Sequence, residues 1–304
     1  METRLTSHSL PAHSLFMGMI RANTVEEFSH PISTHVAPLF AFEGLHGHVA
    51  GTAVLIAPGL AMTARHVIDD LLGHFGRGVE KKSEIQLDMY IYQANVGAVW
   101  YVAHINAWVG TDIAILSLRP RNDIARSTAV NRLPMTVDPP SEGSEVTALG
   151  YPDTKIVLPR NDFSVTELKL SITPTVSSGK VLDVHLSLRD SVSLRFPCFS
   201  VDAAFLGGMS GGAVFNQQRE LCGLVCAGGE GELGNYSNAV SIWPSMIIPV
   251  TLPPDAPVSS GIECGHPYKV HDLARLGHLD FRGHERIEFF KHDNGTDGVR
   301  RLHY

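Results

Sequence analysis

Three short stretches of the sequence carry the residue types of nucleophilic catalysis. Ser210 lies between glycines in "GGMSGGAVF", His66 lies in "TARHVID", and Asp112 opens the run "DIAILSL". A serine hydroxyl is a weak nucleophile at neutral pH and needs an adjacent base, and histidine suits that role because its ordinary pKa lies near neutrality. The imidazole in turn needs a carboxylate that fixes its tautomer and stabilises its charged form. Each stretch alone is typical of a turn or a cap, but together they predict a Ser–His–Asp triad.

The chain around these residues is built from strand-like runs. Between residues 36 and 250, apolar and β-branched runs alternate with Gly, Pro, Asn and Asp. The runs are 51–57, 84–92, 96–108, 113–118, 144–151, 181–188, 211–216 and 220–228. Strands of this length, separated by turn signals, are typical of an all-β sandwich or barrel. Only two short helices are predicted, at 66–73 and 241–248.

Two polar segments divide the chain. Residues 119–143 are rich in Pro, Arg, Asn and Asp and read as a connector between two β halves, and 251–261 reads as a second boundary. We therefore predict four parts. These are an N-terminal extension at 1–35, a first β domain at 36–130, a second at 131–253, and a polar C-terminal extension at 254–304 with few core residues.

The composition argues against two classes of partner, nucleic acids and membranes. The net charge is −7, with no basic cluster before the end of the chain, which argues against nucleic acid as the main partner. No apolar run reaches the roughly 18 residues of a membrane-spanning helix, and the N-terminus lacks the apolar core of a signal peptide. We therefore expect a cytoplasmic protein that does not bind membranes. Its cysteines are expected to be reduced, and no Cys/His spacing predicts a metal site or a cofactor; they are Cys198, Cys222, Cys226 and Cys264.

The chain resembles the chymotrypsin/trypsin-like serine peptidases, with the bacterial HtrA-type protease domain as the nearest group. The order His66, Asp112, Ser210 is that of the family. "GTAVLIAPGLAMTARHV" is similar to the family's approach to its histidine, "DIAILSL" to "DIALLKL", and "GGMSGGAVF" to "GNSGGPLV". The resemblance covers about residues 36–250. It implies two antiparallel six-stranded β-barrels of the chymotrypsin type with the active site between them.

The resemblance also implies a role for each site residue. Ser210 would attack the scissile carbonyl, His66 would carry its proton to the leaving amine, and Asp112 would orient His66. The backbone N–H groups of Gly208 and Ser210 would form the oxyanion hole, where glycine allows the required backbone shape. The implied enzyme is a serine endopeptidase that works through an acyl-enzyme intermediate on protein or peptide substrates.

A substrate pocket is implied by the same comparison. Its base would be Ala204, its walls would come from Cys226, Ala227 and Gly228, and Ser237 and Asn238 would form a third side. No acidic residue stands at the base, so we expect an uncharged, small-to-medium apolar side chain rather than Arg or Lys. Asp202 and Glu230 lie close in sequence and leave a basic preference open.

Two positions depart from the family pattern. Met209 precedes the nucleophile, where secreted members carry an Asp that pairs with a new N-terminus after zymogen cleavage. Activation by that route is therefore not expected, and we hypothesise that a regulatory partner or ligand orders residues 203–209. Arg65 precedes His66, where the family has Ala or Asn, and it either faces solvent or contacts the substrate or an extension.

Two other functions use the same residues. The chain could be a peptide-binding module on a protease scaffold whose catalysis is dispensable, or an esterase with the same machinery. The intact triad favours the endopeptidase over the binding module, and the esterase stays open because the acyl chemistry is shared.

Overall fold

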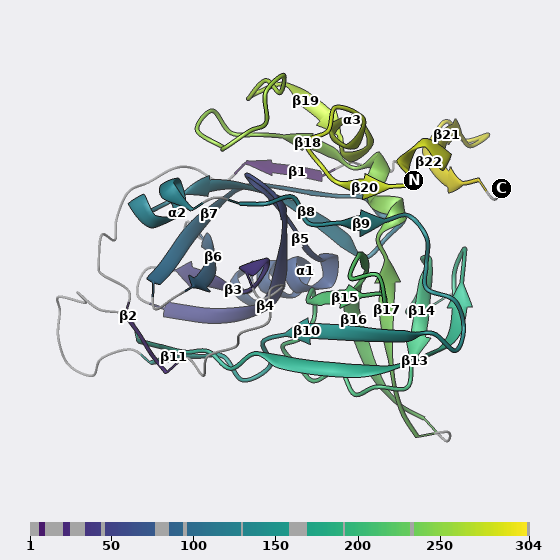
Figure 1. The fold of residues 1–304 in the computed structure, drawn as a ribbon, viewed down its shortest axis with the longest axis horizontal. Helices are drawn as coiled ribbons and strands as arrows, with labels where there is room; N and C mark the ends of the chain where they lie inside the picture. Colours follow the sequence, from purple (N-terminus) through teal and green to yellow (C-terminus); the bar gives the residue numbers. More distant parts are fainter. Residues whose placement is uncertain are drawn as a thin grey trace.

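The computed structural model describes most of the chain. The described residues are 6–9, 21–24, 34–43, 46–76, 85–93, 96–128, 130–157, 169–190, 192–231 and 234–302. Strands dominate these residues, and short helices lie at strand ends (Figure 1). Within these ranges, no helix has the length and apolar character needed to cross a membrane.

The first barrel is a closed antiparallel sheet. Its strand order is β7-β6-β3-β4-β5-β8, and pairing of β7 with β8 closes it. The short strand β1 (Thr6–Ser9) adds to the edge of β7. The six barrel strands are β3 (Val36–Glu43), β4 (His46–Ala57), β5 (Leu60–Ala64), β6 (Ile85–Gln93), β7 (Val96–Ala107) and β8 (Ile113–Pro120).

The second barrel closes in the same way. Its order is β15-β10-β13-β14-β17-β16, and β15 pairs with β16. The predicted pair of antiparallel six-stranded barrels is confirmed. The six strands are β10 (Glu145–Gly150), β13 (Thr175–His185), β14 (Cys198–Val201), β15 (Ala213–Phe215), β16 (Leu221–Gly231) and β17 (Gly234–Ser241).

Smaller elements join and flank the barrels. The two predicted short helices correspond to α1 and to the 3₁₀ helix η2. The small elements up to residue 251 are β2 (Arg21–Thr24), α1 (Arg65–Gly76), α2 (Asp123–Ser127), β9 (Met135–Thr136), β11 (Lys155–Val157), β12 (Lys169–Ser171), η2 (Trp243–Ile247) and β18 (Pro249–Thr251). After residue 251 follow β19 (Pro267–Lys269), α3 (Val270–Arg275), β20 (Phe281–Arg282), η3 (His284–Arg286), β21 (Ile287–Lys291) and β22 (Asp297–Arg301).

Three hydrophobic clusters explain how the barrels meet. One fills the first barrel around Trp100, and one fills the second around Phe199. The third lies between the barrels and combines Ile113 of β8 with Leu224 and Val240 of the second barrel. Because side chains alternate along a strand, one face of such a strand packs inside its barrel and the other packs in this interface. The interface therefore holds the start of β8 against β16.

The C-terminal segment is part of the third cluster. Figure 1 shows residues 249–302 across the top of both barrels. Leu252, Leu273 and Phe281 are buried among the interface residues, and β20 pairs with β9 at Phe281↔Met135. The polar composition of 254–304 predicted few core residues, but the segment extends the second sheet and buries side chains in the interface.

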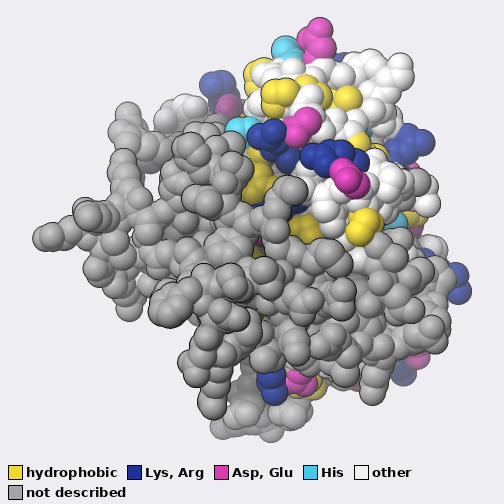
Figure 2. All heavy atoms as spheres, turned by 90° about the vertical axis from the view of Figure 1, so that its left-hand side faces the viewer, with side chains coloured by type: hydrophobic (Ala, Val, Ile, Leu, Met, Phe, Trp, Pro, Cys, Tyr) yellow, Lys and Arg dark blue, Asp and Glu magenta, His cyan; other side chains and the backbone are white. Residues whose placement is uncertain are grey.

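Ion pairs tie the same segment to the barrels. Arg286 and Arg301 each lie 2.6 Å from a carboxylate oxygen of Asp138, and Arg119 Nε lies 2.6 Å from Asp255 Oδ1. Burial alone would raise the pKa of Asp138, but the hydrogen bonds and charges of the two arginines lower it below its usual value. From the left side of Figure 1, acidic and basic side chains alternate on the described surface near the top (Figure 2).

We predict that Leu273→Ala destabilises the protein by about 3 kcal/mol, because it leaves a cavity in the interface cluster. Leu273 is 0% exposed, whereas Leu276, three residues later at the end of the same helix, is 47% exposed. Leu276→Ala is therefore the matched control and should change the free energy of unfolding by less than about 0.5 kcal/mol. Urea denaturation of both variants measures this, and equal effects would contradict a packed C-terminal segment.

Candidate active site

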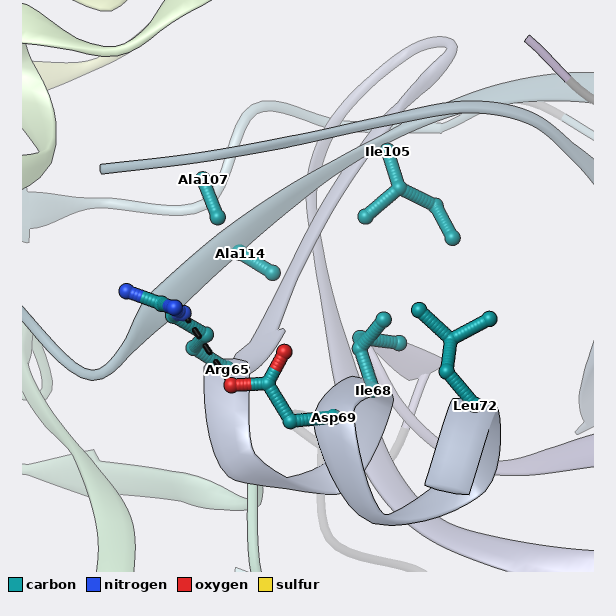
Figure 3. Close-up of a pocket in the computed structure, with 7 residues that line it drawn as sticks. All are labelled: Arg65, Ile68, Asp69, Leu72, Ile105, Ala107 and Ala114. Atoms are coloured by element: carbon teal, nitrogen blue, oxygen red, sulfur yellow. Dashed lines mark hydrogen bonds and ion pairs between the residues drawn. The ribbon is translucent and has the colours of Figure 1, made fainter. Parts of the chain in front are cut away.

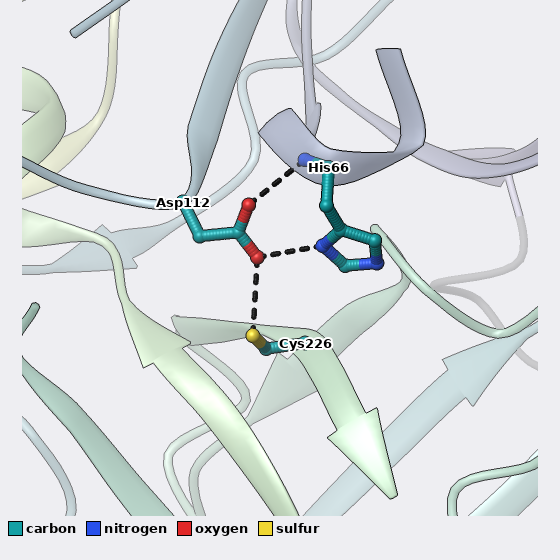
Figure 4. A group of neighbouring side chains, drawn as sticks. All are labelled: His66, Asp112 and Cys226. Atoms are coloured by element: carbon teal, nitrogen blue, oxygen red, sulfur yellow. Dashed lines mark hydrogen bonds and ion pairs between the residues drawn. The ribbon is translucent and has the colours of Figure 1, made fainter. Parts of the chain in front are cut away.

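A buried carboxylate joins the two barrels at the candidate site. Asp112 immediately precedes β8, and its Oδ1 accepts the backbone N–H of His66 at 2.9 Å. Its Oδ2 lies 2.7 Å from His66 Nδ1 and accepts the Cys226 thiol at 3.0 Å (Figure 4). His66 belongs to the first barrel and Cys226 to β16 of the second. The side chains of His66 and Cys226 thus converge on the carboxylate of Asp112.

Strand pairing brings His66 and Asp112 together although 46 residues separate them. β5 pairs with β8 so that Ala64 lies opposite Ile113. The residues that follow β5 and precede β8 are therefore neighbours, and the backbone N–H of Arg65 donates to the Asp112 carbonyl at 3.1 Å. Helix α1 begins at this point and turns the His66 side chain toward the carboxylate.

The carboxylate sets the protonation of both neighbours. Burial lowers the pKa of His66, but the hydrogen bond and charge of Asp112, with the charges of Asp70 and Asp69, raise the pKa above its ordinary value. With Nδ1 bound to Asp112, His66 Nε2 has no partner among the described residues and is available for proton transfer. Burial and the Asp112 charge raise the pKa of the Cys226 thiol far above its usual range, so it stays a protonated donor.

The loop of the second barrel that carries Ser210 packs on the first barrel. Thr52 of β4 donates its backbone N–H to the Ser210 carbonyl at 2.9 Å and its hydroxyl to the Gly208 carbonyl at 3.0 Å. Gly211 has φ +81°, and a Cβ there would clash with the Thr52 carbonyl and the Thr63 hydroxyl. Only glycine lets the loop approach β4 and β5 this closely, a few residues from His66.

The Ser210 hydroxyl itself has no hydrogen bond to His66 within 3.5 Å in the part of the chain that the structure describes. Such bonds are often long before substrate binds and tighten in the Michaelis complex. Three predicted residues are thus held by a common scaffold, but only the His66–Asp112 pair is in direct contact.

The backbone N–H groups of Gly208 and Ser210 have no acceptor among the residues that the structure describes. By contrast, Met209 donates to Leu206 at 3.0 Å and Gly211 donates to Val225 at 2.8 Å. Gly208 has φ +89°, a conformation that favours glycine. Both N–H groups are therefore free to bind an oxyanion.

The sequence and the fold agree with one known family. The model of the trypsin-like peptidase domain matches residues 51–224, more than half of the 304-residue chain. The chain belongs to the trypsin-like peptidase family. It is accordingly a hydrolase of the trypsin-like serine protease type. No curated protein matches it.

Several solved structures resemble this trypsin-like peptidase. The Rv3671c protease from M. tuberculosis in its active form is 14% identical, with 76% of this chain and 88% of that chain covered and a TM-score of 0.46. The MamO protease domain from Magnetospirillum magneticum is 14% identical, with 70% and 94% covered and a TM-score of 0.45. The HtrA-type protease AlgW with a decapeptide is 18% identical, with 69% and 61% covered and a TM-score of 0.44.

The expected pocket residues of the peptidase lie near the site in different settings. Ala204 is exposed in the loop between β14 and β15, and the thiol of Cys226 contacts Asp112. Ala227 and Gly228 lie on β16 opposite Asn238 and Ser237 of β17. The expected pocket residues therefore lie on two paired strands, β16 and β17, and on one loop.

Ser237 fixes the loop next to these strands. Its buried hydroxyl donates to the Ala203 carbonyl at 2.7 Å and accepts the Phe205 N–H at 2.8 Å. The Asp202 carboxylate accepts the backbone N–H of Lys180 on β13. Asp202 is therefore bound to β13.

Arg65 lines a pocket between α1 and the strands β7 and β8 (Figure 3). Ile68, Leu72 and Ile105 give it apolar walls, and Arg65 Nε lies 3.2 Å from Asp69 Oδ2 at its rim. Arg65 is thus half-buried and paired with a residue one turn later on its own helix.

Sequence reasoning assigned Cys226 only to a pocket wall and missed its contact with Asp112. The two residues are 114 positions apart, and no local pattern signals a contact across two barrels. The donor atoms of His66, Asp112 and Cys226 lie within 4.8 Å of one another, a set that could ligate a metal ion. Their mutual hydrogen bonds already account for these atoms, and the absence of a metal or cofactor stays a prediction.

Met209 anchors the loop that carries Ser210 through apolar packing. Its side chain is fully buried in the second barrel's core, and its sulfur accepts the Leu206 N–H at 3.4 Å. A Cβ at Gly150 would lie 2.9 Å from the Met209 backbone, so the loop packs directly on β10. Packing thus takes the place of the ion pair that the family's secreted members use.

We predict that Met209→Asp prevents folding or destabilises the protein by more than about 3 kcal/mol, because it buries a carboxylate without a partner. Met209→Leu keeps volume and polarity and should cost less than about 1.5 kcal/mol. Thermal unfolding of both variants, with Leu206→Asp on the exposed neighbour as control, makes the measurement. A stable Met209→Asp variant would contradict the apolar anchor.

Proposed function

We propose that this trypsin-like serine peptidase is an endopeptidase with Ser210 as nucleophile, His66 as general base and acid, and Asp112 as the orienting carboxylate. The observation that carries the proposal is the 2.7 Å contact between His66 Nδ1 and Asp112 Oδ2. That contact holds the imidazole in one tautomer, with Nε2 left to face the substrate.

Proton transfer in the proposed mechanism follows from that tautomer. His66 Nε2 takes the Ser210 proton as the hydroxyl attacks the scissile carbonyl, and Asp112 stabilises the imidazolium that forms. His66 then gives the proton to the leaving amine, and water hydrolyses the acyl-enzyme by the same steps. The Cys226 thiol donates to Asp112 throughout and keeps the carboxylate in place.

The oxyanion hole is assigned to Gly208 and Ser210. Their N–H groups have no acceptor among the described residues, and both belong to the loop that carries the nucleophile. In other serine proteases one such donor contributes about 3 kcal/mol to stabilising the transition state.

The open edge of β16 supports an extended peptide substrate. β15 pairs with β16 as far as Leu224, and the Gly211 and Gly212 backbones bond to Val225. Beyond that point, residues 227–231 pair with β17, Cys226 lies in a bulge, and no other strand within the described ranges pairs with residues 226–231. A peptide with its scissile bond at Ser210 and its N-terminal part along this edge would run antiparallel to β16, where backbone pairing holds it.

The finer expectations from the sequence stay proposals. These are a small-to-medium apolar residue before the scissile bond and a cytoplasmic location, which the four free cysteines support. A regulatory partner for 203–209 also stays a proposal. The bonds of Ser237 and Thr52 to this loop, and the bond between Leu206 and Met209 within it, support the alternative that the chain alone holds it.

We predict that a fluorophosphonate probe labels the wild-type protein, because a serine activated by His66 attacks phosphorus as it attacks a carbonyl. Ser210→Ala should remove labelling, and His66→Ala should lower its rate at least about a hundredfold. Ser187→Ala, on an exposed serine, is the control and should label at the wild-type rate.

The outcomes separate the candidate functions. Labelling of Ser210→Ala at the wild-type rate would overturn the assignment of the nucleophile. A folded wild-type protein that binds peptides without labelling would favour the peptide-binding module. Labelling that rises only when a cell extract is added would support the regulatory partner.

We predict that kcat/KM rises with pH through an apparent pKa above 6.5, because only neutral His66 accepts the serine proton and Asp112 raises the pKa of His66. In Asp112→Asn the largest raising influence is gone while burial and the charges of Asp70 and Asp69 remain, so the imidazole pKa should fall relative to the wild-type protein. NMR titration of the imidazole measures this in both proteins, independently of the much lower activity of the variant. An unshifted pKa would contradict the role of Asp112.

A further inference from the structure

Arg189 contacts β17 of the second barrel, the strand next to β16. Arg189 is half-buried in the loop between β13 and β14. Its Nη1 donates to Asn238 Oδ1 at 3.3 Å and its Nη2 to the Tyr236 hydroxyl at 3.2 Å. Its guanidinium carbon lies 5.2 Å from the centre of the Tyr236 ring. The guanidinium is therefore fixed on two residues of β17.

The surrounding loop is preformed. The backbone N–H of Arg189 donates to Leu194 at 3.0 Å, and buried Asn238 also accepts the Ser200 hydroxyl at 2.9 Å. The neighbouring Asp190 carboxylate accepts three backbone N–H groups of residues 192–194, at 2.8, 2.6 and 3.2 Å. In the part of the chain that the structure describes, Arg189 thus has neutral oxygen partners and no carboxylate within ion-pair distance.

Strand register relates Arg189 to the open edge of β16. Asn238 lies opposite Ala227, and Tyr236 lies opposite Gly229. Ala227 directly follows Cys226, whose thiol contacts Asp112. The Arg189 guanidinium therefore lies on β17, one strand away from the open edge of β16. Its partners lie opposite the residues that follow Cys226 by one and by three positions.

This register places a particular substrate residue beside Arg189. If a peptide lies antiparallel on the open edge, with the residue before its scissile bond opposite Cys226, its fourth residue before that bond lies opposite Gly229. Residues opposite each other in a sheet project side chains to the same face. The fourth residue and Tyr236 therefore share a face, with glycine between them and no side chain to separate them.

The distance suits a long acidic side chain. Two strand spacings amount to about 9.5 Å, which the side chains of Arg and Glu together span. A guanidinium held at neutral acceptors binds a carboxylate with its remaining N–H groups.

Building on the proposed function, we propose that Arg189 selects substrates with an acidic residue, Glu above Asp, at the fourth position before the scissile bond. The interaction is partly exposed, so it contributes selectivity of about fivefold rather than an absolute requirement.

The test uses two fluorogenic peptides that differ only by Glu or Gln at the fourth position. Wild-type protein should cleave the Glu peptide with about fivefold higher kcat/KM. Arg189→Gln should cleave both equally, at the wild-type rate for the Gln peptide, and Arg189→Glu should prefer a Lys peptide instead. The same peptides with Glu moved to the third position are the control, because side chains alternate and the third faces away.

A binding measurement distinguishes failure of the proposed selectivity of Arg189 from failure of the proposed endopeptidase function. Dissociation constants of the Glu and Gln peptides are measured on Ser210→Ala, which needs no turnover. If the wild-type protein cleaves neither peptide but the Glu peptide binds about fivefold more tightly, the proposed endopeptidase function is wrong and the proposed role of Arg189 is supported. If both peptides are cleaved, and neither kcat/KM nor the dissociation constant differs between the Glu and Gln peptides, the proposed role of Arg189 is wrong and the endopeptidase function is supported. An Arg189→Gln variant that loses activity on both peptides and melts at lower temperature shows a structural role only and also overturns the inference.

Discussion

The buried carboxylate of Asp112 is the interaction on which the rest of the structure depends. A buried charge is costly unless hydrogen bonds satisfy it, and Asp112 accepts bonds from His66 of the first barrel and from Cys226 of the second. Hydrogen bonds weaken within a few tenths of an ångström, so the carboxylate is satisfied only when the barrels are docked in one arrangement. The same docking brings the Ser210 loop onto Thr52. The arrangement of the barrels that stabilises the interface is therefore the same arrangement that sets the geometry of the site.

The C-terminal segment contributes to that docking. Asp255 pairs with Arg119 at the end of β8, while Phe281 extends the second sheet beside β9. Leu273 and Leu252 pack in the cluster between the barrels. A segment that contacts both barrels resists their relative motion, since any rotation would have to break contacts on each side. The segment lies away from Ser210 in the chain but stabilises the arrangement that Asp112 needs.

Local patterns predicted an all-β sandwich or barrel and brought His66, Asp112 and Ser210 to notice, because alternation and glycine placement are encoded over a few residues. The pair of six-stranded barrels was predicted only through the family resemblance. The strands β6, β7, β8 and β16 lie within a few residues of the predicted runs. Strand β17, "GNYSNAVS", was not predicted, because its Ser and Asn side chains serve buried hydrogen bonds rather than an apolar face. The core role of Leu273 and Phe281 and the contact of Cys226 were also missed. They depend on tertiary pairing between distant segments, which no local period records.

Met209, the residue before Ser210, shows how apolar packing can hold this loop of the chain without a charge. An ion pair can hold the loop only when both charged groups are present and each is in its charged protonation state. Met209 instead lies in the core of the second barrel, and its sulfur accepts the Leu206 N–H, so the loop takes its shape as the barrel folds. Apolar packing neither titrates near neutrality nor weakens through salt screening. The loop that carries Gly208 and Ser210 is therefore held by a group that does not titrate, whereas the pKa of His66 depends on the nearby charge of Asp112.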